Sequence, residues 1–234
     1  MYRRAVTHLK RADPTMARVI EAVGPCRFAV RTDGTHFEHI ARAIVFQQLS
    51  TKAATTIHGR VLALFGDAGL SPAAVLATPD DALRAAGLSR AKIKYVKDLA
   101  GHTAAETVPI DRLHELSNAD AIDALVRIKG VGRWTADMVL MFRLGRLDVV
   151  PGLDLGIRKA VQRAYRLRRL PTPERVQTLG ATWAPYGSIA TWYLWRSLEL
   201  PTETATEPAA ASRARSRSRR VRPRTAAASP PSRR

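Results

Sequence analysis

The fold is decided by residues 117–154, which read SNADAIDALVRIKGVGRWTADMVLMFRLGRLDVVPGLD. Ser117, followed three places later by Asp120, resembles a capping box, and apolar residues then recur on one helical face. A second segment with the same periodicity follows a Gly-Val-Gly turn, and a loop rich in glycine and proline ends at Asp154. The pattern predicts two helices joined by a tight hairpin, with a carboxylate placed after the second helix.

The hairpin has the composition of a phosphate-binding turn. Glycine tolerates the positive φ of such a turn and lets backbone approach a ligand closely, and glycines bracket Val131 here. The next helix, predicted to begin near Arg133 or Trp134, presents unpaired N–H groups. The residues expected to bind DNA are Lys129, Gly130, Val131, Gly132, Arg133 and Thr135. The alternative is a turn that only joins two packed helices, but the strongly basic chain favours nucleic acid.

Three stretches of the chain resemble one protein family. Residues 125–142 (LVRIKGVGRWTADMVLMF) and 148–161 (DVVPGLDLGIRKAV) resemble the helix-hairpin-helix and Gly/Pro-loop-plus-aspartate signature of the HhH-GPD DNA glycosylase superfamily. Residues 37–54 (FEHIARAIVFQQLSTKAA) are similar to its 3-methyladenine DNA glycosylase II branch, which the chain resembles most. The similarity runs from about Arg11 to Leu200.

The resemblance implies an all-α, two-lobed fold with the active site in a cleft between the lobes. Residues 1–200 would form the helical glycosylase domain, with the hairpin at 117–144 and the catalytic loop at 148–158. Helix signals dominate elsewhere too, because Thr35 with Glu38 forms a second capping box. Three prolines follow Ser or Thr, the order typical of a helix start: Pro72, Pro79 and Pro173.

Asp154 is the catalytic carboxylate that the resemblance implies. Asp148, at the start of the loop, matches the signature less well. Breaking an N-glycosidic bond develops positive charge on the sugar, and a nearby carboxylate stabilises it. Asp154 also precedes a helical pattern, so the structural alternative is an N-cap, and the two roles are compatible.

Trp134 occupies the position where strand-cutting relatives carry a Schiff-base lysine. Without that amine, the expected reaction is hydrolysis by water, which leaves an abasic site in an uncut strand. Lys129 and Lys159 are near in sequence, but we interpret them as phosphate-facing or solvent-facing charges.

A base can be excised only after it leaves the stack, so the enzyme needs a wedge and a pocket. By resemblance the wedge is Gln48 or Leu49; the alternative is that Gln47 and Gln48 hydrogen-bond at a helix junction. The resemblance favours Trp195 as a stacking face and places Trp134 near the site. Trp192 is a further pocket candidate, with core packing as the alternative for most of the aromatic residues.

The resemblance also implies a cation and a substrate class. The main-chain carbonyls of Ile128 and Val131 would hold a structural Na⁺ or K⁺, and no other cofactor is implied. Alkylated purines such as 3-methyladenine and 7-methylguanine are cationic leaving groups that need no general acid, so neutral hypoxanthine would be a poorer substrate. Two alternatives remain: a glycosylase that also cuts the strand, and a non-catalytic DNA-binding module.

Composition narrows the class of protein. A net charge of +18 and a pI near 11.2 predict attraction to double-stranded DNA. A single cysteine, Cys26, excludes the four-cysteine iron–sulfur cluster of some relatives. Residues 201–234, rich in Arg, Ser and Pro, are predicted to be a disordered basic tail. We expect a monomer without a membrane segment, located in the cytoplasm and, in a bacterium, at the nucleoid.

Overall fold

The computed structural model describes residues 2–201, and this part of the chain contains helices and no strand. The all-α prediction is therefore confirmed for these residues. The α-helices are α1 (Arg3–Ala12), α2 (Pro14–Val23), α3 (His36–Phe46), α4 (Thr51–Ala63), α5 (Pro72–Ala77), α6 (Asp80–Ala85), α7 (Arg90–Ala104), α8 (Asn118–Leu125), α9 (Arg133–Phe142), α10 (Leu155–Ala164), α11 (Pro173–Gly180) and α12 (Gly187–Ser197). Three short 3-10 helices accompany them: η1 (Gly66–Ala68), η2 (Ile110–Glu115) and η3 (Ala181–Trp183).

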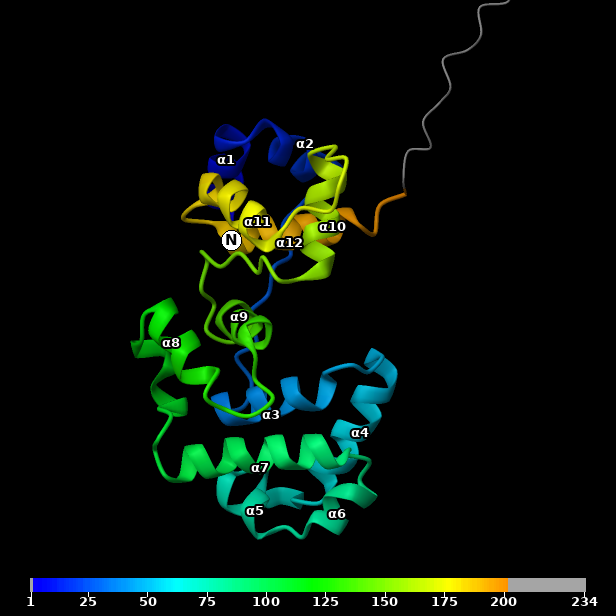
Figure 1. The fold of residues 1–234 in the computed structure, drawn as a ribbon, viewed down its shortest axis with the longest axis vertical. Helices are drawn as coiled ribbons and strands as arrows, with labels where there is room; N and C mark the ends of the chain where they lie inside the picture. The colour runs from blue at the N-terminus through cyan, green and yellow to red at the C-terminus, as the bar shows by residue number, and fades with distance from the viewer. Residues whose placement is uncertain (1, 202–234) are drawn as a thin grey trace, which may run out of the picture. The chain divides into compact units, whose positions relative to one another are not determined.

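The helices form two packed groups within the compact unit of residues 1–200. In one group α1, α2, α10 and α12 pack on one another, and α11 packs against η3 and α10. In the other, α7 packs across α3 and α5, and α4 packs on α3. Helix α9 packs on α3 and α8, and Figure 1 shows it between the two groups. The hairpin lies between α8 and α9.

Side-chain caps determine where most of these helices begin. Thr35 and Glu38 form the expected capping box, and Ser117 accepts a hydrogen bond from the N–H of Asp120 at 3.1 Å. Each such cap contributes about 1 kcal/mol. Pro72 and Pro173 follow the caps Ser71 and Thr172 as predicted.

Helix α6 departs from the predicted proline pattern. Pro79 is itself the N-cap residue there, because the Thr78 hydroxyl donates backwards to the Ala74 carbonyl at 2.7 Å and ends α5. The predicted start was therefore wrong by one residue.

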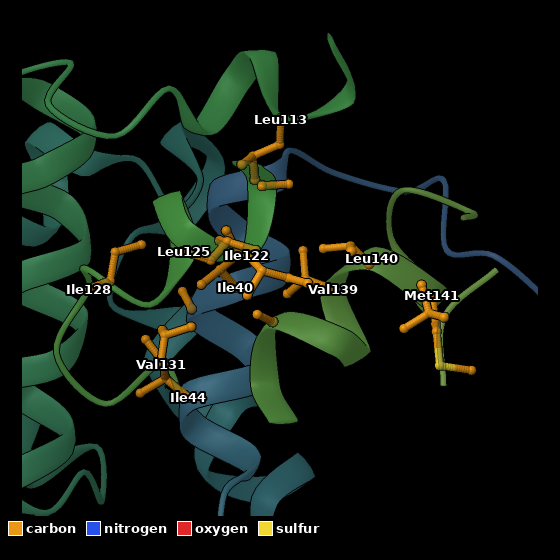
Figure 2. Close-up of a cluster of buried hydrophobic side chains, with 14 of the residues drawn as sticks. Ile40, Ile44, Leu113, Ile122, Leu125, Ile128, Val131, Val139, Leu140 and Met141 are labelled. Carbon is orange, nitrogen blue, oxygen red and sulfur yellow. The ribbon is translucent and has the colours of Figure 1, made fainter. Parts of the chain in front are cut away.

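The hairpin rests on a buried apolar cluster. Figure 2 shows buried side chains of this cluster, which come from α3, η2, α8, α9 and the hairpin: Ile40, Ile44, Leu113, Ile122, Leu125, Ile128, Val131, Val139, Leu140 and Met141. Ile128 and Val131 are 1% and 3% exposed. Because the turn's own apolar residues are buried, the hairpin is anchored to both flanking helices.

Two further predictions concern the basic tail and a membrane segment. Residues 202–234, which hold almost all of the predicted basic tail, lie outside the described residues. No helix within residues 2–201 is long and apolar enough to cross a bilayer.

Candidate active site

Asp154 lies at the start of α10 with its carboxylate held by three N–H donors. Its Oδ1 accepts from the backbone N–H of Ile157 at 2.7 Å, which is the predicted N-cap bond. The same oxygen accepts from Trp195 Nε1 at 3.0 Å, and Oδ2 accepts from Trp134 Nε1 at 2.7 Å. The structure thus brings together the predicted catalytic residue and two of the three predicted pocket residues. Hydrogen bonds to an ionised carboxylate are about twice as strong as those between neutral groups.

Two glycines in and beside the loop make this arrangement possible. A Cβ on Gly156 would lie 2.9 Å from Asp154 Oδ1 and 3.3 Å from Trp195 Nε1. A Cβ on Gly152 would lie 2.8 Å from the backbone oxygen of Pro173. The absence of a side chain at Gly156 therefore lets the indole of α12 reach the carboxylate. Sequence reasoning missed Gly156, although it lies within the family-like signature.

The aromatic residues divide into those at Asp154 and those elsewhere. The ring of Phe142, which sequence reasoning also missed, stacks on Trp195 with centroids 6.0 Å apart. Trp192 instead packs edge-on against Tyr193 at 5.0 Å, so its pocket role stays a prediction. Trp183 is fully buried and donates to Asp13, as the core-packing alternative expects.

The two hairpin glycines have different conformations. Gly130 has φ +80°, and a Cβ there would lie 2.2 Å from the ring of Tyr95. Gly132 has φ −89° and ψ 175°, so the expected positive φ is wrong at this position. The reason is that Gly132 is the N-cap of α9, where extended backbone is usual. No side chain in the described structure caps α9, which leaves its first N–H groups for a ligand.

The charged side chains beside the hairpin have protein partners. Lys129 Nζ lies 2.7 Å from Asp98 Oδ1, although the lysine side chain is 72% exposed. Arg133, half exposed, donates through Nε to the buried Asp137 at 3.0 Å. Burial raises the pKa of Asp137, and the bond from Arg133 opposes that rise. Both cations are therefore held in fixed directions, with further N–H groups on the guanidinium of Arg133.

The predicted wedge turn connects α3 to α4 and contacts the hairpin. Gln48 has a left-handed backbone with φ 56°, and Leu49 is 39% exposed. Gln47 Nε2 donates to the Gly130 carbonyl at 2.8 Å and to Thr135 Oγ1 at 3.2 Å. Thr135 is only 4% exposed, so its side chain binds Gln47 within the protein and does not face solvent as a DNA contact would.

The two carbonyls predicted to hold a cation belong to the hairpin itself. The Ile128 carbonyl accepts from the Val131 N–H at 3.0 Å, which closes the turn. A carbonyl oxygen has a second lone pair, so this bond does not prevent it from coordinating an ion. Among residues 2–201, no three His, Cys, Asp or Glu side chains gather as a metal site.

Residues 41–185 match the HhH-GPD superfamily of base excision DNA repair proteins. DNA-3-methyladenine glycosylase 1 of Schizosaccharomyces pombe is 34% identical over 206 residues, which cover 86% of this chain and 90% of the relative. The S. pombe 3-methyladenine DNA glycosylase Mag1 in complex with abasic DNA has a TM-score of 0.75 at 33% identity, covering 84% of this chain and 97% of that one. A DNA-3-methyladenine glycosidase from Bacillus halodurans also has a TM-score of 0.75, at 34% identity, with 82% and 88% covered. Asp154, whose carboxylate is held by two indoles, follows the glycine hairpin in the sequence. By the family match and these similarities, the chain belongs to the HhH-GPD superfamily of base excision DNA repair proteins.

Proposed function

We propose that this protein is a monofunctional DNA glycosylase that removes alkylated purines, such as 3-methyladenine and 7-methylguanine, and leaves an abasic site. The observation that carries the proposal is the Asp154 carboxylate, held by two indole N–H groups and one backbone N–H. The similarity to 3-methyladenine glycosylases over most of the chain supports the substrate class.

The carboxylate acts on the sugar of a flipped nucleotide. As the N-glycosidic bond breaks, its electron pair moves to the alkylated base and neutralises the positive charge there. Asp154 stabilises the cationic sugar that remains, water adds through its oxygen to C1′, and the proton of that water passes to solvent. The three N–H donors hold the carboxylate in place, so little reorganisation is needed when the charge develops.

In the described part of the chain, the groups bonded to the carboxylate of Asp154 are two indoles and a backbone N–H, and none is an amine that could form a Schiff base. Trp134 stands after the hairpin, and Lys129 is paired with Asp98. Lys159 is exposed on α10, one turn beyond the helix start. These placements favour attack by water and an uncut strand.

The surroundings of Asp154 suit an extruded base. Trp134, Trp195 and Phe142 supply aromatic faces for a cationic purine, in a cleft that we place between the two helix groups. Gln48 or Leu49 would fill the gap left in the duplex. The free N–H groups of α9 and the carbonyls of Ile128 and Val131, the latter through a Na⁺ or K⁺ ion, would hold DNA phosphates.

The partner is double-stranded DNA carrying alkylated bases. We propose that the enzyme works as a monomer in the cytoplasm, at the nucleoid if the source is bacterial, and needs no redox or organic cofactor. The net charge of +18 supports attraction to DNA under these conditions.

The test is base release from methylated duplex DNA, measured by chromatography of the free bases. We expect 3-methyladenine from the wild type and at least about 100-fold slower release from Asp154→Asn, as for the loss of one main electrostatic contact. Asp148→Asn is the matched control, because Asp148 is exposed and its carboxylate accepts from the Gly187 N–H at 3.2 Å. Full activity in Asp154→Asn would contradict the mechanism.

Borohydride trapping and DNA binding test the two alternative functions. A covalent adduct with lesion DNA would reveal a strand-cutting glycosylase, which we do not expect. Tight DNA binding with no released base would reveal a non-catalytic binding module.

A further inference from the structure

Helix α7 contacts the wedge turn and the hairpin with side chains three residues apart. These are Lys92, Tyr95 and Asp98, which lie on successive turns of one side of the helix. The wedge turn and the hairpin are separated by more than eighty positions in sequence, as the Gln47–Gly130 bond shows with its separation of 83. A single helix therefore supports both DNA-facing segments.

Lys92 holds the wedge turn. Its Nζ donates to the carbonyls of Val45 and Gln47 at 2.6 and 2.8 Å, where α3 ends and its last carbonyls lack helical partners. The side chain is half-buried, so these two bonds replace part of the hydration of the ammonium. Gln48, the residue with left-handed backbone, follows directly after this anchored point.

Tyr95 and Asp98 hold the hairpin. The ring of Tyr95 lies against Gly130, where any Cβ would meet it at 2.2 Å. Asp98 accepts from the backbone N–H of Lys129 at 2.8 Å and from its Nζ at 2.7 Å. The position of the hairpin relative to α7 is thereby set by one ring contact and two hydrogen bonds.

Gln47 closes the arrangement by joining the two segments directly. Its side-chain amide donates to the Gly130 carbonyl, and its own backbone carbonyl accepts from Lys92. Gln47 is thus bonded at both ends: its side chain bonds to the hairpin and to Thr135 of α9, and its backbone carbonyl bonds to α7. This explains why it differs in role from its neighbour Gln48.

We propose that Gln47 and Lys92 form a brace that couples phosphate binding at the hairpin to insertion of the wedge. Gln47 is a positioning residue in this arrangement and touches neither the base nor the sugar. When the hairpin binds the backbone of the duplex, the brace sets the depth at which Gln48 and Leu49 meet the base stack. The inference rests on the proposed base-flipping function and adds a residue pair that it requires.

The experiment uses the full chain and two readouts. Fluorescence of 2-aminopurine placed beside a lesion rises when the lesion leaves the stack, and binding to undamaged duplex reports the hairpin alone. For Gln47→Ala and Lys92→Met we expect affinity for undamaged duplex within about twofold of wild type, because the phosphate contacts remain. We expect the flipping signal and kcat to fall about tenfold, as for the loss of two hydrogen bonds.

Matched variants separate positioning from simple destabilisation. Lys94→Met, two residues along α7 and exposed, is the control for Lys92→Met, and Lys92→Arg should restore flipping by keeping the donors. Gln47→Glu keeps the shape of the side chain but cannot donate to a carbonyl. The flipping signal should therefore fall as much in Gln47→Glu as in Gln47→Ala. In the double variant Gln47→Ala/Lys92→Met, the flipping signal should fall by no more than about the larger of the two single-variant losses, because both residues act through one linkage.

The outcomes are distinguishable. If wild type and Gln47→Ala flip and excise equally well, the brace is wrong while the glycosylase stands. If undamaged-duplex binding and kcat fall together, or melting temperature alone accounts for the loss, the coupling is wrong. If wild type releases no base, the proposed function fails, and the fluorescence still tests the brace.

Discussion

At the scale of single residues, the environment of Asp154 depends on indole donors from two different helices. Trp134 reaches one carboxylate oxygen from α9, and Trp195 reaches the other from α12. Trp134 is 41% exposed beside the carboxylate, while the ring of Trp195 stacks on Phe142. The two tryptophans therefore differ in exposure, and Trp195 is the one whose N–H can be removed while an aromatic ring is kept against Phe142.

Trp195→Phe removes one donor while keeping an aromatic ring against Phe142. We expect kcat to fall about tenfold with KM nearly unchanged, because a hydrogen bond to a charged group is worth about 1.5–3 kcal/mol. Single-turnover release of 3-methyladenine measures the effect. Trp192→Phe is the comparison, because Trp192 packs edge-on against Tyr193; an equal loss there would support its predicted pocket role. Full activity in Trp195→Phe would contradict the role of the Trp195 N–H.

The hairpin glycines provide a second test at this scale. Gly130→Ala should lower the free energy of unfolding by at least about 2 kcal/mol, because a side chain at positive φ is strained and its Cβ meets the Tyr95 ring. Gly132→Ala has extended backbone and open space, so its stability should stay within about 1 kcal/mol of wild type. Urea unfolding compares the two. Weakened DNA binding by folded Gly132→Ala would then report close approach of phosphate to that backbone.

At the scale of elements, Asp13 joins three parts of the first helix group. It caps α2 through the N–H groups of Thr15 and Met16 at 2.8 and 3.2 Å. It also accepts from Trp183 Nε1 at 3.1 Å and from the hydroxyl of Tyr165. Asp13 is 8% exposed, so its charge depends on these donors for stabilisation.

Stability should therefore depend on the ionisation of Asp13. Burial raises the pKa of this carboxyl, but the bonds from Tyr165, Trp183 and the two backbone N–H groups lower it further, and the net shift is downward. A lowered folded-state pKa contributes stability above about pH 4, the ordinary value, and the contribution is lost as pH falls through the folded-state pKa. Asp13→Asn should cost about 2 kcal/mol at pH 7. Thermal melting should show that the difference in stability between wild type and Asp13→Asn shrinks as the pH falls. A difference that stays constant with pH would contradict a stabilising role of the ionised Asp13.

At the scale of the whole molecule, positive charge is divided between residues 1–200 and the terminal stretch. Residues 201–234 contain nine arginines and two glutamates and contribute +7 of the net +18. The hairpin, the wedge turn and Asp154 all lie within residues 1–200, which form one compact unit. Long-range attraction and chemistry are therefore separable.

Removal of residues 201–234 should weaken DNA binding without changing kcat at saturating DNA. Each arginine that contacts a phosphate adds about 0.9 to the slope of log affinity against log salt, so the slope should become shallower. Titration of the truncated and full chains between low and physiological salt measures it. A loss of kcat at saturating DNA would show that the terminal stretch takes part in the reaction.

The sequence by itself determined the helices that begin at recognisable caps, the presence of the hairpin and the place of Asp154 at a helix start. Caps and periodicity act over three or four residues, so they can be recognised locally, as Ser117 and Asp154 show. The error at α6 arose where two local capping patterns competed, because Thr78 ended the preceding helix instead of starting the next.

Only the tertiary structure decided which side chains meet at the site. Trp195 reaches Asp154 from 41 positions away, and Gln47 reaches Gly130 across 83. Likewise, Thr135 is buried against Gln47 although it lies beside the hairpin in sequence. Such contacts depend on how α3, α7, α9 and α12 pack, and packing is set by the joint fit of many side chains that no single segment contains.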